Sequence, residues 1–384
     1  DAGFNEFTSL FERNETRFNI SGFGGSNNTT GGEAVLSSVY NSVSGSVGYF
    51  DYDTDGFRNN NDLRHKVWDV YGQWAVSSAF NVQAEYRNRD TEYGDLAQNF
   101  DLDDFDKTLR TDTEEEVIRL GARISPNQQS DILLSFINSE IDSTRNSVPV
   151  DDVVPPPFEG PPPGFFRIDE ESDASLDTDQ YDVQYVLQKP LFKLVTGASY
   201  SDSDTDELIT SVASYEFPPF VTPPVTDPPF FIDAKSDTDD KRLYAYSDWT
   251  IIPSVTGTVG LSYVDFEDDV KAFEKVEFDR FNPKLGVRWD INNGLTARAA
   301  YFKNVMPVTA SKRTLEPTQV AGFNQFYDDP NATRSTRYGG ALDWQPNNEL
   351  AFGAELTKRD VEAPVLNIPK GSIPYEDRDE WNYR

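Results

Sequence analysis

Apolar and polar residues alternate along this chain in segments of about seven to ten residues, and the pattern recurs about a dozen times. In one such segment, Phe80, Val82, Ala84 and Tyr86 are separated by polar or charged residues. Because successive side chains of a strand point to opposite faces, each segment predicts a strand with one apolar and one polar face. Many such strands in one chain predict an all-β antiparallel barrel with a wet lumen and an apolar outer surface.

The connections between these segments alternate between tight turns and long acidic loops. Turn-forming residues dominate the short connections, such as Asn41-Ser42, Lys189-Pro190 and Asn292-Asn293-Gly294. Strict alternation predicts an up-and-down barrel whose turns lie at one end and whose loops lie at the other, as in bacterial outer-membrane barrels. We therefore expect an outer-membrane location, with the long loops outside the cell. About sixteen strands are predicted near residues 16–25, 33–41, 43–52, 65–77, 80–90, 115–125, 130–141, 178–189, 191–201, 241–252, 255–266, 277–290, 295–304, 334–345, 350–360 and 379–384.

The long loops that separate these pairs of strands are expected to be extracellular. Two of them, 142–177 and 202–240, contain the proline-rich stretches 148–164 and 216–230, for which we expect extended conformations. The remaining long loops are predicted at residues 53–64, 91–114, 267–276, 305–333 and 361–378.

The alternation also assigns each side chain to a face of the barrel. The outward face collects residues that lipid accepts, namely Trp68, Val70, Trp74, Ile118, Leu120, Ile124, Phe192, Leu194, Leu243, Trp249, Leu285, Val287, Trp289, Leu342, Trp344, Phe352 and Leu356. If the opposite face were buried in a dry core, each unpaired charge on it would cost several kcal/mol of folding free energy. A water-filled lumen removes this cost because the charges stay hydrated. The candidates to face the lumen are Asp69, Gln73, Arg119, Arg123, Asp182, Gln184, Tyr244, Asp248, Lys284, Arg288, Arg298, Asp343 and Glu355.

Composition narrows the functions that the chain could have. The net charge is −32, which disfavours a nucleic-acid partner. The chain has no cysteine and one histidine, His65, so cysteine nucleophiles, zinc–thiolate sites and histidine-based triads are excluded. Acidic pairs are so frequent that spacing selects none of them for acid–base catalysis. We therefore expect no enzyme, no catalytic residue and no organic cofactor.

One loop carries the spacing of a calcium site. Residues 51–62 place Asp51, Asp53 and Asp55 at positions one, three and five, glycine at position six and Asp62 at position twelve. Position eight, usually apolar, is Arg58, and the last position is aspartate in place of the longer glutamate. Calcium bound by Asp51, Asp53, Asp55 and Asp62 is thus one interpretation. A solvated acidic loop between two strands is the alternative, and it is the one we favour.

Several short motifs resemble a known family. Residues 281–304 (FNPKLGVRWDINNGLTARAAYFKN) resemble barrel hairpins of TonB-dependent outer-membrane receptors, and Thr314–Gln319 resembles a stretch of one of their extracellular loops. Other segments are similar to receptor-like barrels that some bacteria fuse to tetratricopeptide repeats, namely residues 7–13, 52–62, 83–87 and 315–325. The resemblance implies a β-barrel that moves a ligand across the outer membrane.

The chain departs from that family pattern at its N-terminal end. Such receptors carry a plug of about 150 residues before the barrel, whereas the alternation here begins near Arg17. We therefore expect a periplasmic lead-in at residues 1–15 and a barrel over 16–384, as the portion of a longer polypeptide that lacks a plug. A complete sixteen-stranded barrel is the alternative.

Four functions fit these observations. The first is a transport barrel that takes up or passes a ligand through its lumen. The second is an export pore for polysaccharide or protein, and the third is a structural or adhesive surface barrel with acidic, calcium-binding loops. The fourth is a soluble acidic β-protein. For the membrane interpretations, the expected partners are outer-membrane lipid, lipopolysaccharide, and a periplasmic repeat domain or energy-coupling protein.

Overall fold

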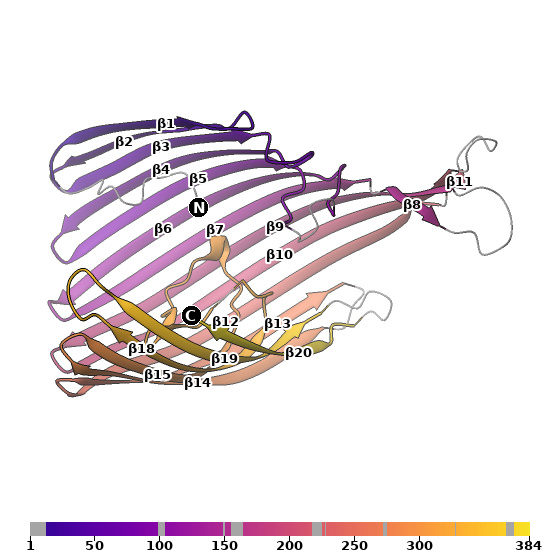
Figure 1. The fold of residues 1–384 in the computed structure, drawn as a ribbon. Helices are drawn as coiled ribbons and strands as arrows, with labels where there is room; N and C mark the ends of the chain where they lie inside the picture. Colours follow the sequence, from indigo (N-terminus) through magenta and orange to yellow (C-terminus); the bar gives the residue numbers. More distant parts are fainter. Residues whose placement is uncertain are drawn as a thin grey trace.

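The computed structural model describes residues 13–98, 104–148, 150–154, 164–216, 225–226, 228–271, 275–326, 328–365 and 372–384. Within them, eighteen strands form one sheet whose pairings are all antiparallel. Two are short additions, β8 (Val150–Val154) beside β9 (Gly164–Lys189) and β11 (Val225–Thr226) beside β10 (Phe192–Glu216). The other sixteen pair with one another in chain order, which is the up-and-down arrangement that the alternation predicts. Figure 1 shows the sheet curving so that its first and last strands lie on opposite sides of a concave space.

The strands agree with the predicted ones except at their ends. They are β1 (Thr16–Gly24), β2 (Thr30–Tyr40), β3 (Val43–Thr54), β4 (Leu63–Ser77), β5 (Phe80–Tyr93), β6 (Arg110–Asn127), β7 (Ser130–Ser147), β9 (Gly164–Lys189), β10 (Phe192–Glu216), β12 (Phe230–Ile252), β13 (Val255–Val270), β14 (Val276–Asn292), β15 (Leu295–Val305), β18 (Arg334–Trp344), β19 (Phe352–Pro364) and β20 (Tyr375–Tyr383). The connection from β15 to β18 holds the 3₁₀ helix η1 (Ala310–Lys312) and a separate two-stranded sheet, β16 (Gln319–Val320) with β17 (Phe323–Asn324). No helix of the described residues is both long and apolar enough to span a membrane.

Strands β9, β10 and β12 run far into the segments predicted to be loops. Thr205, for example, pairs with Leu176 on one side and with Ser236 on the other. These extensions are rich in Ser, Thr and Asp on both faces, so they lack the apolar alternation that reveals the rest of each strand. The predicted proline-rich stretches fall mainly on residues 155–163 and 217–224, and the predicted lead-in falls mainly on residues 1–12, all outside the described residues.

The burial of side chains is inverted relative to a soluble protein. Large apolar side chains are exposed on the convex face; Trp249 is 51% exposed and Leu342 is 52% exposed. On the opposite face, charged side chains are buried; Lys284 is 1% exposed and Asp240 is 1% exposed. This inversion is expected where lipid is the outer solvent, because lipid accepts apolar groups and a polar interior satisfies the charged ones. It confirms the prediction of a membrane β-barrel fold.

Aromatic side chains form two rows on the convex face. Near the tight turns, Phe192 packs on Trp249 with ring centroids 4.4 Å apart. Towards the long connections, Tyr263 packs on Phe281 with ring centroids 4.9 Å apart. On β13, the outward residues between these rows run from Val255 to Tyr263, close to the 9–11 residues of a membrane-spanning strand. The two rows therefore correspond to the aromatic belts at the two membrane interfaces.

Candidate functional site

The connection between β15 and β18, residues 306–333, lies against the concave face of the sheet, and we call it the inner connection (Figure 1). Its ends are closed by backbone hydrogen bonds from Met306 N to Thr333 O at 2.8 Å and from Ala332 N to Met306 O at 3.2 Å. Its helix η1 reaches the far wall, where Ala310 packs with Val117 of β6 and Ile137 of β7. The sequence predicts an extracellular loop here, and the structure instead shows a segment that crosses the concave side.

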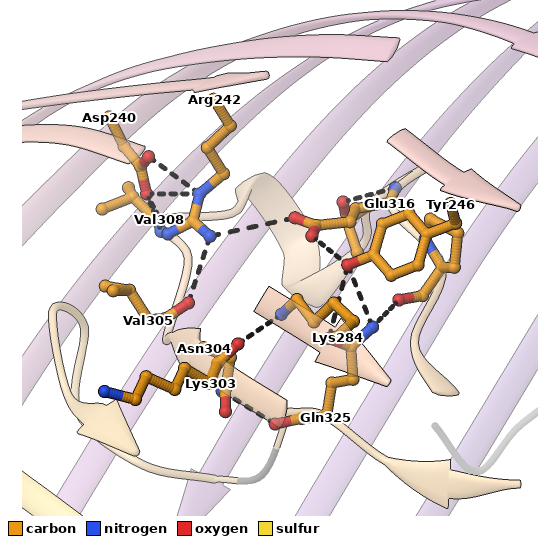
Figure 2. Close-up of polar contacts among 12 residues, drawn as sticks. Asp240, Arg242, Tyr246, Lys284, Lys303, Asn304, Val305, Val308, Glu316 and Gln325 are labelled. Carbon is orange, nitrogen blue, oxygen red and sulfur yellow. Dashed lines mark hydrogen bonds and ion pairs between the residues drawn. The ribbon is translucent and has the colours of Figure 1, made fainter. Parts of the chain in front are cut away.

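A buried ion pair on β12 binds the start of this crossing (Figure 2). The guanidinium of Arg242 donates to both carboxylate oxygens of Asp240, with Nε to Oδ1 at 2.8 Å and a terminal nitrogen to Oδ2 at 2.8 Å. Arg242 also donates to Val305 O at 3.1 Å, and Val308 N donates to Asp240 Oδ2 at 3.0 Å. The remaining hydrogen-bonding groups of the pair thus fix the point where β15 becomes the inner connection. These additional hydrogen bonds also help to offset the desolvation cost of burying an ion pair.

A second buried group joins Tyr246 of β12 to Glu316 and Gln325 of the inner connection (Figure 2). The Tyr246 hydroxyl donates to Glu316 Oε1 at 2.6 Å, and Gln325 Nε2 donates to the same hydroxyl at 3.2 Å. Gln325 Nε2 also donates to Pro317 O at 2.5 Å. Glu316 Oε2 is buried and has no hydrogen bond, but it lies 3.9 Å from an Arg242 nitrogen. The Arg242 side chain therefore offsets the charge of Glu316, and the Tyr246 hydroxyl donates a hydrogen bond to its carboxylate.

The β16–β17 hairpin lies flat on the wall because two wall residues are glycine. A Cβ on Gly286 of β14 would lie 2.8 Å from Ala321 Cβ, and a Cβ on Gly339 of β18 would lie 2.7 Å from the Phe323 ring. At the turn, Ala321 and Gly322 have φ of 48° and 84°, as a tight hairpin turn requires. Phe323 and Val320 then pack with wall residues such as Phe302 in a buried apolar cluster.

Two glutamines of β9 bind the backbone of the inner connection. Gln180 accepts from Ala310 N at 2.9 Å and donates to Arg313 O at 3.0 Å, and it is fully buried. Gln184 donates to Leu315 O and also to the Tyr244 hydroxyl, the latter at 3.2 Å. Amide side chains can donate and accept at once, so they suit the exposed peptide groups of a segment that lacks regular structure.

The predicted lumen-facing residues lie on this same concave face. Lys284, buried beneath the inner connection, donates to Lys303 O at 2.6 Å. Arg298 pairs with Asp343 at 2.7 Å, lies 3.7 Å from Glu355 and covers the Phe323 ring. That these residues line a path for a solute stays a prediction.

The remaining predicted lumen-facing residues lie near the short turns or on β4 to β7 and β9. Asp69 pairs with Arg87 at 3.1 Å, and Arg119 pairs with Glu85 at 2.8 Å. Closer to the turns, the exposed Arg123 and Arg288 pair with Asp131 and Asp290. Gln73, Arg119, Arg123 and Asp182 line one cavity together with the inner connection.

This cavity, which we call the wall cavity, has a volume of about 580 Å³. It lies between the inner connection and the wall strands β4 to β9. Its lining carries four cationic side chains, several amides and hydroxyls, and one carboxylate. The polar members are Gln73, Asn81, Gln83, Arg119, Arg123, Ser135, Asp182, Lys312, Arg313, Thr314 and Thr318.

The predicted calcium residues do not converge on one point. Asp51 accepts from the Tyr49 hydroxyl at 2.9 Å, Asp55 accepts from Asn28 at 2.6 Å, and Asp62 pairs with Arg110. Asp53, Asp55 and Asp62 line a common cavity of about 430 Å³. Among the described residues, the carboxylates close enough to share an ion are those of Asp202, Asp204 and Asp237. Calcium at residues 51–62 stays a prediction.

Two rows of paired carboxylates follow the outer aromatic belt on the convex face. One row contains Asp179, Asp202, Asp239, Glu267 and Glu277, each directly paired with the next across β9 to β14. The other row contains Glu116, Glu140, Asp177, Asp204, Asp237 and Asp269 across β6 to β13. Like charges at directly paired positions repel, so these rows are a destabilising feature of the wall as it stands.

The sequence interpretation missed the residues that hold the inner connection. Every second residue of β12, counted from Tyr244, faces the interior, and this series includes Asp240, Arg242 and Tyr246. On β9, the series that contains Asp182 includes Gln180. This period of two was the available signal: the prediction placed Asp240 in the loop 202–240, and Gln180, Arg242 and Tyr246 lay in predicted strands without being named as interior candidates. Nothing in the pattern of Glu316 or Gln325 indicates burial, because their segment has no strand periodicity.

Comparison with known proteins identifies the same architecture. A family model described as "TonB dependent receptor-like, beta-barrel" matches residues 2–363. Among solved structures, FpvAI in complex with pyocin S2 aligns with a TM-score of 0.70 at 11% identity, over 95% of this chain and 53% of that one. BauA, the ferric preacinetobactin receptor of Acinetobacter baumannii, aligns with a TM-score of 0.66 at 11% identity, over 97% and 60%.

The copper transporter OprC aligns with a TM-score of 0.67 at 11% identity, over 97% of this chain and 59% of that one. The chain therefore spans between half and three-fifths of the length of these structures. No curated protein matches it by sequence.

Proposed function

Because this chain belongs to the TonB dependent receptor-like β-barrel family, we propose that it forms the wall of an outer-membrane transport pathway and takes up or passes a solute through its lumen. The family is one of bacterial outer-membrane barrels, and the exposed apolar face between two aromatic rows fits that location. We assign no bond-making or bond-breaking reaction to the chain.

One observation carries the proposal. The inner connection is held on the concave face by buried ion pairs and amides instead of extending away from the barrel as a loop. A segment fixed at this place narrows the lumen and presents Lys312, Arg313 and Thr318 to whatever passes. Such an arrangement suits a selective path, since pore width and lining groups together determine what crosses a barrel.

The absence of cysteine allows a direct test of this function. Thr318→Cys places a single thiol at the wall cavity, and Leu356→Cys places one on the lipid-facing side. We expect a charged methanethiosulfonate reagent to reduce the conductance of planar bilayers that contain Thr318→Cys and to leave Leu356→Cys unchanged. If neither variant conducts, or if the reagent affects both equally, the transport role is contradicted.

A second role, as a structural surface barrel, is favoured by the two carboxylate rows. They follow the outer aromatic belt, and such belts lie at the level of the lipid headgroups. We propose that divalent cations, calcium among them, bridge these rows to lipopolysaccharide, since carboxylate oxygens are the ligands that calcium prefers. Chelation with EDTA should then release lipopolysaccharide that copurifies with the wild type. Lipopolysaccharide that stays bound after chelation would contradict this role.

The calcium motif at residues 51–62 has a separate test. Calorimetric titration with calcium should give heat that Asp53→Ala reduces, because Asp53 stands at position three of the motif and supplies a ligand there. An unchanged titration after Asp53→Ala would leave the loop as a solvated acidic segment.

For energy supply, we propose a periplasmic coupling protein or repeat domain as the partner at the end of the barrel with the tight turns.

A further inference from the structure

We propose that the wall cavity binds a small solute that carries carboxylate or phosphate groups. This inference rests on the proposed transport function and names the chemical class of its solute. The cavity is distinct in charge from the rest of the molecule, because its lining holds Arg119, Arg123, Lys312 and Arg313 against the single carboxylate of Asp182. In a chain with a net charge of −32, such a cationic excess is local and unusual.

Small wall residues and the side chain of Gln83 form the floor of the cavity. Gly121 of β6 pairs with Ser135 of β7, and Ser135 pairs with Asp182 of β9, so two small residues stand side by side in the sheet. A Cβ on Gly121 would lie 2.9 Å from the Gln83 side chain, which has turned over the glycine. The Gln83 side chain therefore occupies the space above Gly121 and forms part of the cavity lining.

Cationic groups stand around this floor on several elements. Arg119 lies towards the outer belt, and its Nε is buried without a hydrogen bond although its guanidinium pairs with Glu85 at 2.8 Å. Arg123 lies towards the turns and pairs with Asp131 at 2.9 Å. Both partners are wall carboxylates, so each arginine is oriented and keeps further N–H groups for a solute, since a guanidinium has five.

The inner connection supplies the cations that are least neutralised. Among the described residues, Arg313 makes no ion pair, and its side chain is exposed at the cavity. Lys312 lies 3.6 Å from Asp328, but both side chains are almost fully exposed, so solvent screens that pair. The backbone beneath them is fixed, because Gln180 binds both Ala310 N and Arg313 O. A cation on a fixed backbone loses less entropy when it binds an anion.

The uncharged lining narrows the ligand class. Gln73, Asn81 and Gln83 offer amide donors, and Ser135, Thr314 and Thr318 offer hydroxyl groups. No aromatic side chain belongs to this described lining, so there is no platform on which a flat ring would stack. Guanidinium and amide donors without aromatic rings favour oxyanions, because charge-assisted hydrogen bonds to carboxylate or phosphate are the strongest that such groups make.

Isothermal titration of the full chain in detergent micelles tests the inference without any transport step. The probes are citrate for carboxylates, pyrophosphate for phosphates, and sucrose as an uncharged control. We expect saturable binding of citrate, pyrophosphate or both, and none of sucrose. Replacing Arg313 by glutamine should weaken anion binding about threefold to tenfold, and the double variant Lys312→Gln/Arg313→Gln should weaken it further.

Arg145→Gln is the matched control, because Arg145 is exposed on β7 beyond the cavity and its loss removes the same charge. Heat from neither anion at about 10 mM, or equal weakening by Arg313→Gln and Arg145→Gln, would overturn the inference. Binding by one anion alone would assign the cavity to that oxyanion. The titration measures binding and needs no pore. Anion binding can therefore be confirmed when the thiol-blocking experiment contradicts transport, and transport can be confirmed when no anion binds.

Discussion

Tyr246 of β12 donates its hydroxyl hydrogen to Glu316 of the inner connection at 2.6 Å, in a place where both side chains are buried. The two residues are far apart in sequence, and the bond joins the wall to the segment that crosses the lumen. A buried hydrogen bond to a charged group contributes about 1.5–3 kcal/mol, so this pair is one of the attachments that decide where the inner connection lies.

We expect Tyr246→Phe to loosen the inner connection without unfolding the barrel. The variant removes the hydroxyl hydrogen bond of the buried Glu316 carboxylate, at a cost of about 1.5–3 kcal/mol. Hydrogen exchange of residues 314–325, measured by mass spectrometry, should speed up accordingly. Tyr338→Phe, on the lipid-facing side, is the control and should leave that exchange unchanged. Equal protection in both variants would show that the hydroxyl does not hold the segment.

Asp240→Asn should expose the inner connection to protease. Removing one member of a buried ion pair leaves an uncompensated charge and costs about 3–5 kcal/mol. Arg242 would then keep its hydrogen bond to Val305 O and the Glu316 carboxylate at 3.9 Å, and Val308 N would lose its charged acceptor. We expect faster trypsin cleavage after Lys312 and Arg313, followed on gels of the detergent-solubilised protein. Asp239→Asn, one residue earlier and on the other face, should be cleaved at the wild-type rate.

Gly339→Ala should displace the β16–β17 hairpin. The added methyl group would lie 2.7 Å from the Phe323 ring, closer than packed atoms approach, so the ring and its hairpin must move. We expect a loss of about 1–3 kcal/mol in unfolding free energy and faster exchange at residues 319–324. Gly340→Ala is a neighbouring control, because a Cβ there meets nothing within 4 Å. If both alanines behave alike, the close fit of the hairpin to the wall is refuted.

Asp237→Asn should stabilise the barrel at neutral pH and have no such effect in acid. Desolvation raises the pKa of Asp237, as do the carboxylates of Asp204, Asp202, Asp239 and Asp269. An acid whose pKa is raised on folding favours the folded state when protonated, so its contribution is present below about pH 4 and is lost as the pH rises through the raised pKa. Asparagine mimics the protonated form, and its benefit should therefore appear at pH 7 and vanish near pH 4.

Circular dichroism during thermal unfolding in detergent, at pH 7 and pH 4, measures this difference. Asp206→Asn is the control, because the Asp206 carboxylate pairs with Lys235 at 2.8 Å and is not opposed by another acid. A similar rise in melting temperature for both variants at pH 7 would mean that overall charge, and not the paired rows, is responsible.

Much of the fold could be predicted because each membrane-spanning strand has one face in contact with lipid and the other in contact with a polar interior. Trp249 and Leu342 face lipid, and Asp182 and Lys284 face the interior, so the chain alternates at every membrane-spanning strand and the register of faces can be read directly. Where strands β9, β10 and β12 leave the membrane, both faces meet water. The alternation disappears there, and with it the evidence for those strand ends.

The alternation of apolar and polar residues is thus enough to predict the antiparallel barrel wall, its lipid-facing and interior residues and the side that carries the tight turns. The crossing of the concave face by residues 306–333 could not be predicted in this way, because that segment has no periodicity of its own. Its position depends on Asp240, Arg242, Tyr246 and Gln180, which come from strands distant in sequence and bind it through hydrogen bonds that no local pattern encodes. The wall cavity arises in the same way, since Arg119 and Arg313 meet only once the wall has curved around the inner connection.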